Sequence, residues 1–174
     1  MFLACGPCPC SGLLTENDGA SVQLTSFTDY ALRVLIFLGV TDDRLVTIEE
    51  ISSSYGISRH HLTKVVHRLG ALGYVETVRG KNGGNRLARE AAKIRLGDVV
   101  RDFEDNLVIV ECFDRGASTC PIEPGCGLKG ILRSATGKFF EELDRYTLAD
   151  LLRSPKRLRP LLESAPRVRA PRGA

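Results

Sequence analysis

The chain has 174 residues, of which 43% are hydrophobic and 26% charged, and its formal net charge is +3, values typical of an ordinary globular protein. Its richest apolar run, residues 30–40, is interrupted by Arg33 and Gly39 and is shorter than the roughly 18 to 20 apolar residues that cross a bilayer. Residues 1–14 have no basic segment ahead of an apolar core, which argues against a secretory signal. We therefore expect no membrane span and a cytoplasmic location.

Charge is segregated along the chain. Residues 59–95 carry nine basic and two acidic side chains, whereas residues 22–58 carry two and five, and residues 96–152 carry six and eleven. All three histidines also fall inside the basic segment. A compact basic block between acidic segments is typical of a surface that contacts phosphates, so the charge pattern favours a nucleic-acid-binding protein.

The first predicted elements form a helix-turn-helix. Apolar side chains recur every three or four positions over residues 25–40, which predicts an amphipathic helix. Thr47 and Glu50 have the spacing of a capping box ahead of a short helix, and Ser58 can cap a third helix that carries a basic outer face. The helix-turn-helix is predicted over about residues 49–72.

A β-wing is predicted directly after these helices. Residues 74–78 alternate like a half-buried strand, residues 79–84 supply turn residues, and residues 85–88 can return as a second strand. The wing therefore spans about residues 74–88 and completes a winged helix-turn-helix domain over residues 22–95.

The second part of the chain contains a cysteine-bearing loop and a long helix. Residues 96–127 predict a short helix and then the loop, and apolar spacing over residues 128–152 predicts one continuous helix. A helix of about 24 residues would be about 36 Å long, which exceeds what so small a domain needs for its own core. A dimer interface would use this length, although packing on its own domain is the alternative. The predicted fold class is mostly α with a small β-wing: a winged helix-turn-helix plus a long C-terminal dimerisation helix.

Both ends of the chain are predicted to be disordered. Residues 1–21 are rich in Gly, Pro and Cys and show neither helical nor strand periodicity. Residues 153–174 carry four prolines, seven basic residues and one acidic residue, which is typical of a disordered basic tail.

The third helix and the wing contain the candidate DNA contacts. In a helix-turn-helix, the N-terminal residues of the second helix reach base edges in the major groove. Arg59 can form a bidentate pair with guanine, whereas Lys64 and Arg68 suit phosphates. Glycines in the wing allow a close approach to DNA, although a plain hairpin turn would use the same glycines. The predicted DNA-binding residues are Ser58, Arg59, His60, His61, Thr63, Lys64, Arg68, Arg79, Lys81, Asn82, Gly83 and Gly84.

Three cysteines, Cys112, Cys120 and Cys126, lie in the predicted loop. Because cytosolic thiols stay reduced, these residues indicate metal or redox chemistry rather than disulfides. Three thiolates in one Gly- and Pro-interrupted loop can converge on an iron–sulfur cluster and leave one iron open to a small diatomic molecule or an oxidant. Zinc, which usually prefers a tighter cysteine knuckle, and thiols without a role are the alternatives.

Three segments carry a resemblance to a known family, namely LTSFTDYALR, VRGKNGG and LDRYTLADLL. Over about residues 22–152 the chain resembles the nitric-oxide-sensing repressors of the winged-helix iron–sulfur transcriptional regulators. The resemblance implies a homodimer that binds double-stranded operator DNA and releases nitrosative-stress genes from repression when nitric oxide attacks its cluster. It also implies one iron–sulfur cluster (4Fe-4S or 2Fe-2S) per subunit, with Cys112, Cys120 and Cys126 as metal ligands and Asp29 as an additional ligand from the other subunit.

Other functions are weighed against this one. A regulator of iron–sulfur assembly or iron supply belongs to the same superfamily, and a winged-helix DNA-binding protein with zinc or free thiols would need no cluster. An enzyme is not expected, because the sequence has neither a nucleotide-binding glycine motif nor a nucleophile–base pair. Members of the resembling family begin at a position matching Val22, so we expect translation to start there, without Cys5, Cys8 and Cys10; the intact mass of the native protein tests this.

Overall fold

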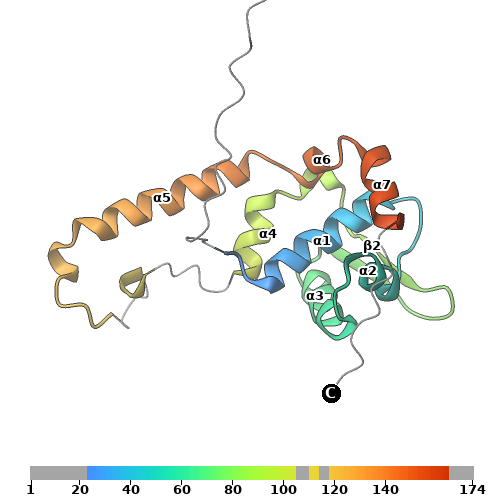
Figure 1. Cartoon of the computed structure of the whole chain (residues 1–174), viewed down its shortest axis with the longest axis horizontal. Helices are drawn as coiled ribbons and strands as arrows, with labels where there is room; N and C mark the ends of the chain where they lie inside the picture. Colours follow the sequence, from blue (N-terminus) through green and yellow to red (C-terminus); the bar gives the residue numbers. More distant parts are fainter. Residues whose placement is uncertain (1–22, 105–109, 114–117, 165–174) are drawn as a thin grey trace, which may run out of the picture.

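The computed structural model describes residues 23–104, 110–113 and 118–164 (Figure 1). The predictions made for residues 1–21, and for the tail from residue 165 onward, lie outside the described residues. The described helices and strands are α1 (Ser26–Val40), α2 (Ile48–Tyr55), α3 (Arg59–Ala71), β1 (Val75–Val78), β2 (Gly84–Leu87), α4 (Leu96–Phe103), α5 (Gly127–Asp144), α6 (Leu148–Leu151) and α7 (Pro155–Ser164), with short 3-10 turns η1 (Ala91–Lys93), η2 (Glu111–Phe113) and η3 (Glu123–Gly125).

The predicted fold class is confirmed, because the described residues are mostly helical and contain one two-stranded sheet. Helix α1 lies at the centre of the core, with α2 and α3 below it and α4 and α6 above it in the view of Figure 1. Its predicted apolar face is buried: Ala31, Val34 and Leu35 have no exposed surface. No helix in the described part of the chain is long and apolar enough to cross a membrane.

The helix-turn-helix forms through the caps that the sequence predicts. The Glu50 amide donates to the Thr47 hydroxyl at 3.2 Å, and the Thr47 amide donates to the Glu50 carboxylate at 2.8 Å, which completes the capping box. Gly56 ends α2 in the left-handed region, with φ 67°. Ser58 then caps α3 by accepting from the His61 amide. These local bonds fix the turn that presents α3.

The wing is an antiparallel hairpin in which Val75 pairs with Leu87 and Val78 pairs with Gly84. Val46 extends the pairing by exchanging two backbone hydrogen bonds with Asn85, at 3.0 and 2.7 Å. The Asn85 side chain is 3% exposed and donates to the Val46 carbonyl. The wing is therefore anchored to the segment that leads into α2.

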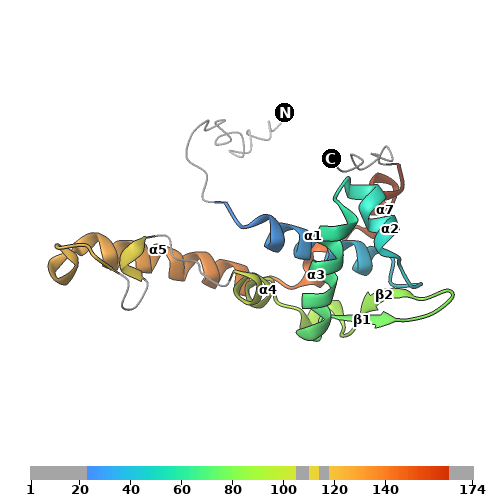
Figure 2. The same ribbon diagram turned by 90° about the horizontal axis from the view of Figure 1, so that it is seen from below.

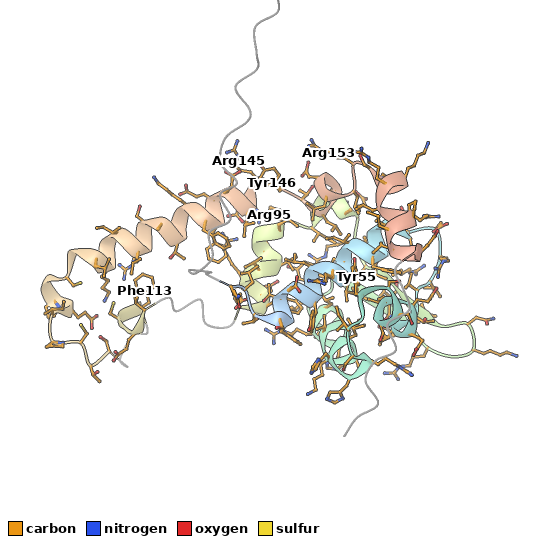
Figure 3. All side chains as sticks on the ribbon, viewed as in Figure 1. Tyr55, Arg95, Phe113, Arg145, Tyr146 and Arg153 are labelled. Carbon is orange, nitrogen blue, oxygen red and sulfur yellow. The ribbon has the colours of Figure 1, made fainter. Side chains whose placement is uncertain are left out.

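The long helix is shorter than predicted, because α5 ends at Asp144 instead of continuing to residue 152. The chain leaves the helix to pair with the segment before α4: the Leu96 amide donates to the Tyr146 carbonyl at 3.0 Å, and the Leu148 amide donates to the Ile94 carbonyl at 2.8 Å. Figure 3 shows Arg95 and Tyr146 close to this junction. A second capping box between Thr147 and Asp150 then starts α6 and buries Leu148. Apolar periodicity continues across the break, so the spacing alone did not reveal it.

The prediction of a disordered tail from residue 153 is wrong for its first part, because α7 occupies Pro155–Ser164. Leu162 packs against the core, and Arg159 donates to the Val40 carbonyl at the end of α1 at 2.9 Å. Proline is tolerated in the first turn of a helix, which accommodates Pro155. Burial of one apolar face stabilises a helix whose composition by itself is typical of disorder.

Candidate functional site

The outward face of α3 is polar and basic, as predicted. Leu62, Val65 and Leu69 are fully buried on its inner face. The side chains on the outer face are exposed: Arg59, His60, His61, Thr63, Lys64, His67 and Arg68. The sequence pattern and the structure therefore agree on which side of the helix can meet a ligand as large as DNA.

Four of the predicted contacts at α3 also have side-chain partners within the chain; one is Thr63, whose hydroxyl donates to the Arg59 carbonyl at 2.8 Å. Arg59 pairs with Glu49 of α2 at 2.9 Å, and Arg68 donates to the Asp102 carbonyl at 3.0 Å. The Arg59–Glu49 pair is solvent-exposed, so breaking it to let Arg59 bind a nucleobase costs at most about 1 kcal/mol. Ser58 caps the helix, which gives it a structural role that stands beside the predicted one.

The wing presents Arg79, Lys81 and Asn82 as exposed residues near its turn. Asn82 has φ 71°, a conformation that asparagine tolerates better than most residues. A Cβ atom on Gly83 would lie 2.3 Å from the Val78 carbonyl oxygen, and one on Gly84 would lie 2.9 Å from the Val46 carbonyl oxygen. Both glycines are thus required by the hairpin itself, and their predicted contact with DNA stays a prediction.

The cysteine loop connects α4 to α5. Cys112 lies in η2, Cys120 precedes η3, and Cys126 directly precedes α5; all three are free, half-buried thiols. The loop is held by two acidic side chains. Glu111 accepts from the Thr119 amide at 2.6 Å and from its hydroxyl at 2.9 Å, and Glu123 pairs with Lys129 of α5.

These contacts also lower the pKa of both carboxyl groups. Hydrogen bonds from the Thr119 amide and hydroxyl lower the pKa of Glu111, and the Lys129 ammonium lowers that of Glu123. Both groups are therefore ionised at neutral pH.

An aromatic contact also joins the loop to α5. Phe113 lies below α5 in Figure 3, and the Arg133 guanidinium lies over the Phe113 ring, 5.9 Å from the ring centroid.

The thiols have the donor chemistry of an iron–sulfur site, but they are not gathered. Among the described residues, no group of three or more His, Cys, Asp or Glu side chains is placed to hold a metal ion. The predicted convergence of Cys112, Cys120 and Cys126 is therefore not observed in this arrangement, in which Glu111 binds Thr119 within the loop and Glu123 binds Lys129 of α5. Their assignment as ligands stays a prediction.

Asp29 lies in the first turn of α1, and its side chain is 43% exposed. Its two carboxylate oxygens accept from Arg33 at 3.0 and 2.8 Å, an i,i+4 pair on the surface of the helix. The neighbouring residue, Tyr30, stacks on His61 of α3 with ring centroids 6.2 Å apart. Asp29 is thus next to a residue that contacts α3, while its assignment as a ligand from another subunit stays a prediction.

Sequence reasoning missed a group of polar contacts at the end of α4. The Tyr74 hydroxyl donates to the Asp102 carboxylate at 2.7 Å, and the Thr25 amide donates to Glu104 at 2.7 Å. These partners are 28 and 79 residues apart in the sequence, so no local spacing could indicate the pairs.

The amino-acid sequence is similar to those of known transcriptional regulators. Residues 24–154 match the Rrf2 family, described as "Iron-dependent Transcriptional regulator". A relative named HTH-type transcriptional regulator NsrR, from Geobacillus kaustophilus, is 50% identical over 143 residues, covering 82% of this chain and 97% of its own. One of the same name from Bacillus subtilis is 48% identical, covering 82% and 98%.

The fold has a solved counterpart. The structure of T. potens IscR matches with a TM-score of 0.63 and 25% identity, covering 79% of this chain and 90% of that one. The sequence relatives are transcriptional regulators and not enzymes, in agreement with the expectation from the sequence. From the family match and these identities we conclude that the chain belongs to the Rrf2 family of transcriptional regulators.

Proposed function

We propose that this chain is a repressor that binds operator DNA as a homodimer, carries one iron–sulfur cluster per subunit, and releases the DNA when nitric oxide attacks the cluster. Nitrosative-stress genes would then be expressed. The observation that carries the proposal is the position of three free thiols on the loop that joins the winged-helix domain to α5. The iron-dependent description of the family supports the cluster, and the sequence resemblance of residues 22–152 supports nitric oxide as the signal.

The residues that would hold the cluster are Cys112, Cys120 and Cys126, with Asp29 of a second subunit as a further ligand. When bound, the cluster supplies an iron that is open to a small diatomic molecule. Gathering the thiols requires the loop to rearrange its Glu111–Thr119 contact, and a ligating Asp29 must leave Arg33. Both contacts involve solvent-accessible side chains, so the cost of exchanging each is small.

The DNA-binding part of the proposal uses α3 and the wing. The exposed N-terminal residues of α3 would read base edges in the major groove, and Arg79 and Lys81 would contact the backbone or the minor groove. Two α3 helices in a dimer would read a pseudo-palindrome whose half-sites are about one helical turn apart.

The dimer would form through α5. This helix has no buried residue, and Figure 2 shows it extending away from the winged-helix domain. Leu128, Ile131 and Phe139 recur at helical spacing along it and are all exposed. Exposed apolar side chains grouped in this way are typical of a protein–protein interface.

Cysteine variants test the coupling of the cluster to DNA binding. Replacing Cys112, Cys120 or Cys126 singly by Ser should lower the iron and sulfide content and weaken specific operator binding, with an unchanged circular dichroism spectrum. Ile122→Ser, at an exposed position of the same loop, is the matched control and should bind the operator normally. Unchanged operator affinity in all three cysteine variants would contradict the proposal.

The cluster itself is tested by an anaerobic absorption spectrum before and after addition of nitric oxide, with iron and sulfide counted per chain. A visible band that nitric oxide bleaches supports the sensor. A protein that stays colourless and iron-free after reconstitution would contradict it, and bound zinc would then favour the zinc alternative.

A second candidate function is the control of iron–sulfur assembly or iron supply, which is favoured by the description of the family as iron-dependent. It uses the same dimer, loop and DNA-binding face and differs in the genes that are controlled. Mapping the sites that the protein occupies in the genome distinguishes the two functions: sites beside nitric-oxide-detoxifying genes support the first, and sites beside cluster-assembly genes support the second.

A further inference from the structure

The C-terminal end of α4 contacts three other elements through three consecutive residues. Asp102 accepts from Tyr74, at the start of the wing, and from Arg68 of α3. Phe103 is buried and lies against Phe27 of α1, with ring centroids 5.3 Å apart. Glu104 accepts from the amide and the hydroxyl of Thr25, the N-cap of α1, at 2.7 and 3.1 Å. We call residues 102–104 the α4 junction.

The α4 junction lies at the start of the cysteine loop. Cys112 follows Glu104 by only eight residues, and η2 is the next described element after α4. The chain therefore passes directly from side chains that hold α1, α3 and the wing to the first of the three thiols. A rearrangement of the loop would therefore act on this end of α4, as well as on α5, which also packs against α4.

The contacts of Asp102 could transmit a movement of the loop to α3 and the wing. Its carboxylate holds the hydroxyl of Tyr74, a residue whose ring is buried in the core, and its backbone carbonyl holds Arg68. Burial and the hydrogen bond to Asp102 raise the pKa of Tyr74, so its hydroxyl stays protonated and donates at neutral pH. The Arg89 guanidinium lies over the ring of this tyrosine, 4.5 Å from its centroid, and donates to the Leu72 and Gly73 carbonyls.

We propose that the α4 junction positions the recognition helix and the wing according to the state of the cysteine loop, with Asp102 and Tyr74 as its main positioning residues. The inference rests on the proposed function, because it assumes that the loop changes when a cluster is present. It assigns the coupling to a contiguous set of contacts that ends on Arg68 of α3 and on the first residue of the wing.

The test compares operator affinity in two states of the protein. The probe is a duplex selected from a random pool by the wild-type cluster-loaded protein, and the measured quantity is the dissociation constant of the cluster-free form divided by that of the cluster-loaded form. Tyr74→Phe and Asp102→Ala should each lower this ratio by about tenfold, the scale of one hydrogen bond to a charged group. Asp102→Asn should keep most of it, because its amide oxygen still accepts from Tyr74.

Tyr55→Phe is the matched control, since it removes a hydroxyl from another tyrosine that packs against the same core. Its ratio should equal that of the wild type. All variants should retain the cluster absorption band, which separates a loss of coupling from a loss of cluster. If the wild-type ratio is well above one and the ratios of Tyr74→Phe and Asp102→Ala equal it, the role of the α4 junction is contradicted. The proposed function would then still stand. A wild-type ratio of one would overturn both.

Hydrogen exchange in the wild-type protein gives a second test that needs no substitution. Amides in the C-terminal half of α3, around Arg68, should exchange at different rates in the cluster-loaded and cluster-free forms. Equal rates there would overturn the proposal even if a Tyr74 or Asp102 variant failed to fold.

Discussion

The turn of the wing depends on the missing Cβ atom of Gly83. A Cβ there would lie 2.3 Å from the Val78 carbonyl oxygen and 2.9 Å from that of Gly80, both of which are backbone atoms that cannot rotate away. The wing tip also needs a left-handed conformation at Gly80 and at Asn82. One side chain of the wrong size would therefore change the whole hairpin.

We predict that Gly83→Ala lowers the free energy of unfolding by roughly 1–3 kcal/mol, the usual cost of forcing a group into occupied space. Urea unfolding measures this. Lys81→Ala, two residues away, should leave stability within about 0.5 kcal/mol, since Lys81 is exposed, but should weaken DNA binding and its dependence on salt. Equal stability of the two variants would contradict the steric argument.

Asp150 makes the stability of α6 dependent on acid pH. Hydrogen bonds from the Thr147 amide and hydroxyl, together with Arg153, lower the pKa of Asp150 from 3.8 to about 2. Because the pKa of Asp150 is lower in the folded state than in the unfolded state, the carboxylate contributes fully to stability above pH 3.8. This contribution to stability is lost as the pH falls toward 2.

Asp150→Ala should therefore be less stable than the wild type at neutral pH, and the difference should disappear near the folded-state pKa of about 2. Thermal unfolding at a series of pH values measures the difference. Glu141→Ala, which removes an exposed carboxylate from α5 without removing a cap, should show no such convergence. A difference that persists unchanged at pH 2 would rule out this role for the Asp150 carboxylate.

At the scale of elements, α7 packs against the winged-helix domain and stabilises it. It lies against the end of α1 and against α2, the first helix of the helix-turn-helix (Figure 1). Arg159 satisfies the Val40 carbonyl at the C-terminus of α1 and also pairs with Asp43 at 3.2 Å. A cation at the end of a helix stabilises the unpaired carbonyls there.

Arg159→Ala should lower the free energy of unfolding by about 1 kcal/mol, the net value of a typical hydrogen bond. Chemical denaturation measures the change. Arg157→Ala is the matched control, because Arg157 is an exposed arginine on the same helix, and it should change stability by less than about 0.5 kcal/mol. If both variants have the same small effect, α7 does not stabilise the domain through Arg159.

At the scale of the whole molecule, the shape of the chain implies a partner for α5. Apart from contacts with α4 near its C-terminal end, this helix projects from the domain with its apolar residues exposed (Figure 2). Burying exposed apolar surface lowers the free energy by about 25 cal/mol for each Å² removed from water. A second copy of α5 would provide that burial and would also place two α3 helices on one DNA site.

Ile131→Glu should therefore shift the proposed dimer toward monomer, since Ile131 is 67% exposed on the same helix as the exposed Leu128 and Phe139. Sedimentation velocity at several concentrations measures the shift. Leu161→Glu on α7, where the leucine is 66% exposed, is the matched control and should remain dimeric. A dimer of unchanged strength in Ile131→Glu would exclude this face of α5 as the interface.

The sequence alone determined the parts of the fold that depend on contacts within a few residues. The Thr47–Glu50 capping box, the Gly56 turn and the Ser58 cap are local, so their spacing indicated the helix-turn-helix correctly. The buried face of α3 also followed, because helical periodicity separates Leu62 and Leu69 from the basic residues.

The tertiary structure decided what depends on residues far apart in the chain. Helix α5 stops at Asp144 because Tyr146 and Leu148 pair with Leu96 and Ile94, and α7 exists because its apolar face finds the core. The α4 junction joins Asp102 to Tyr74 over 28 residues. Such pairings gain their free energy only when the chain has folded, so periodicity and composition, which report local preference, cannot determine them.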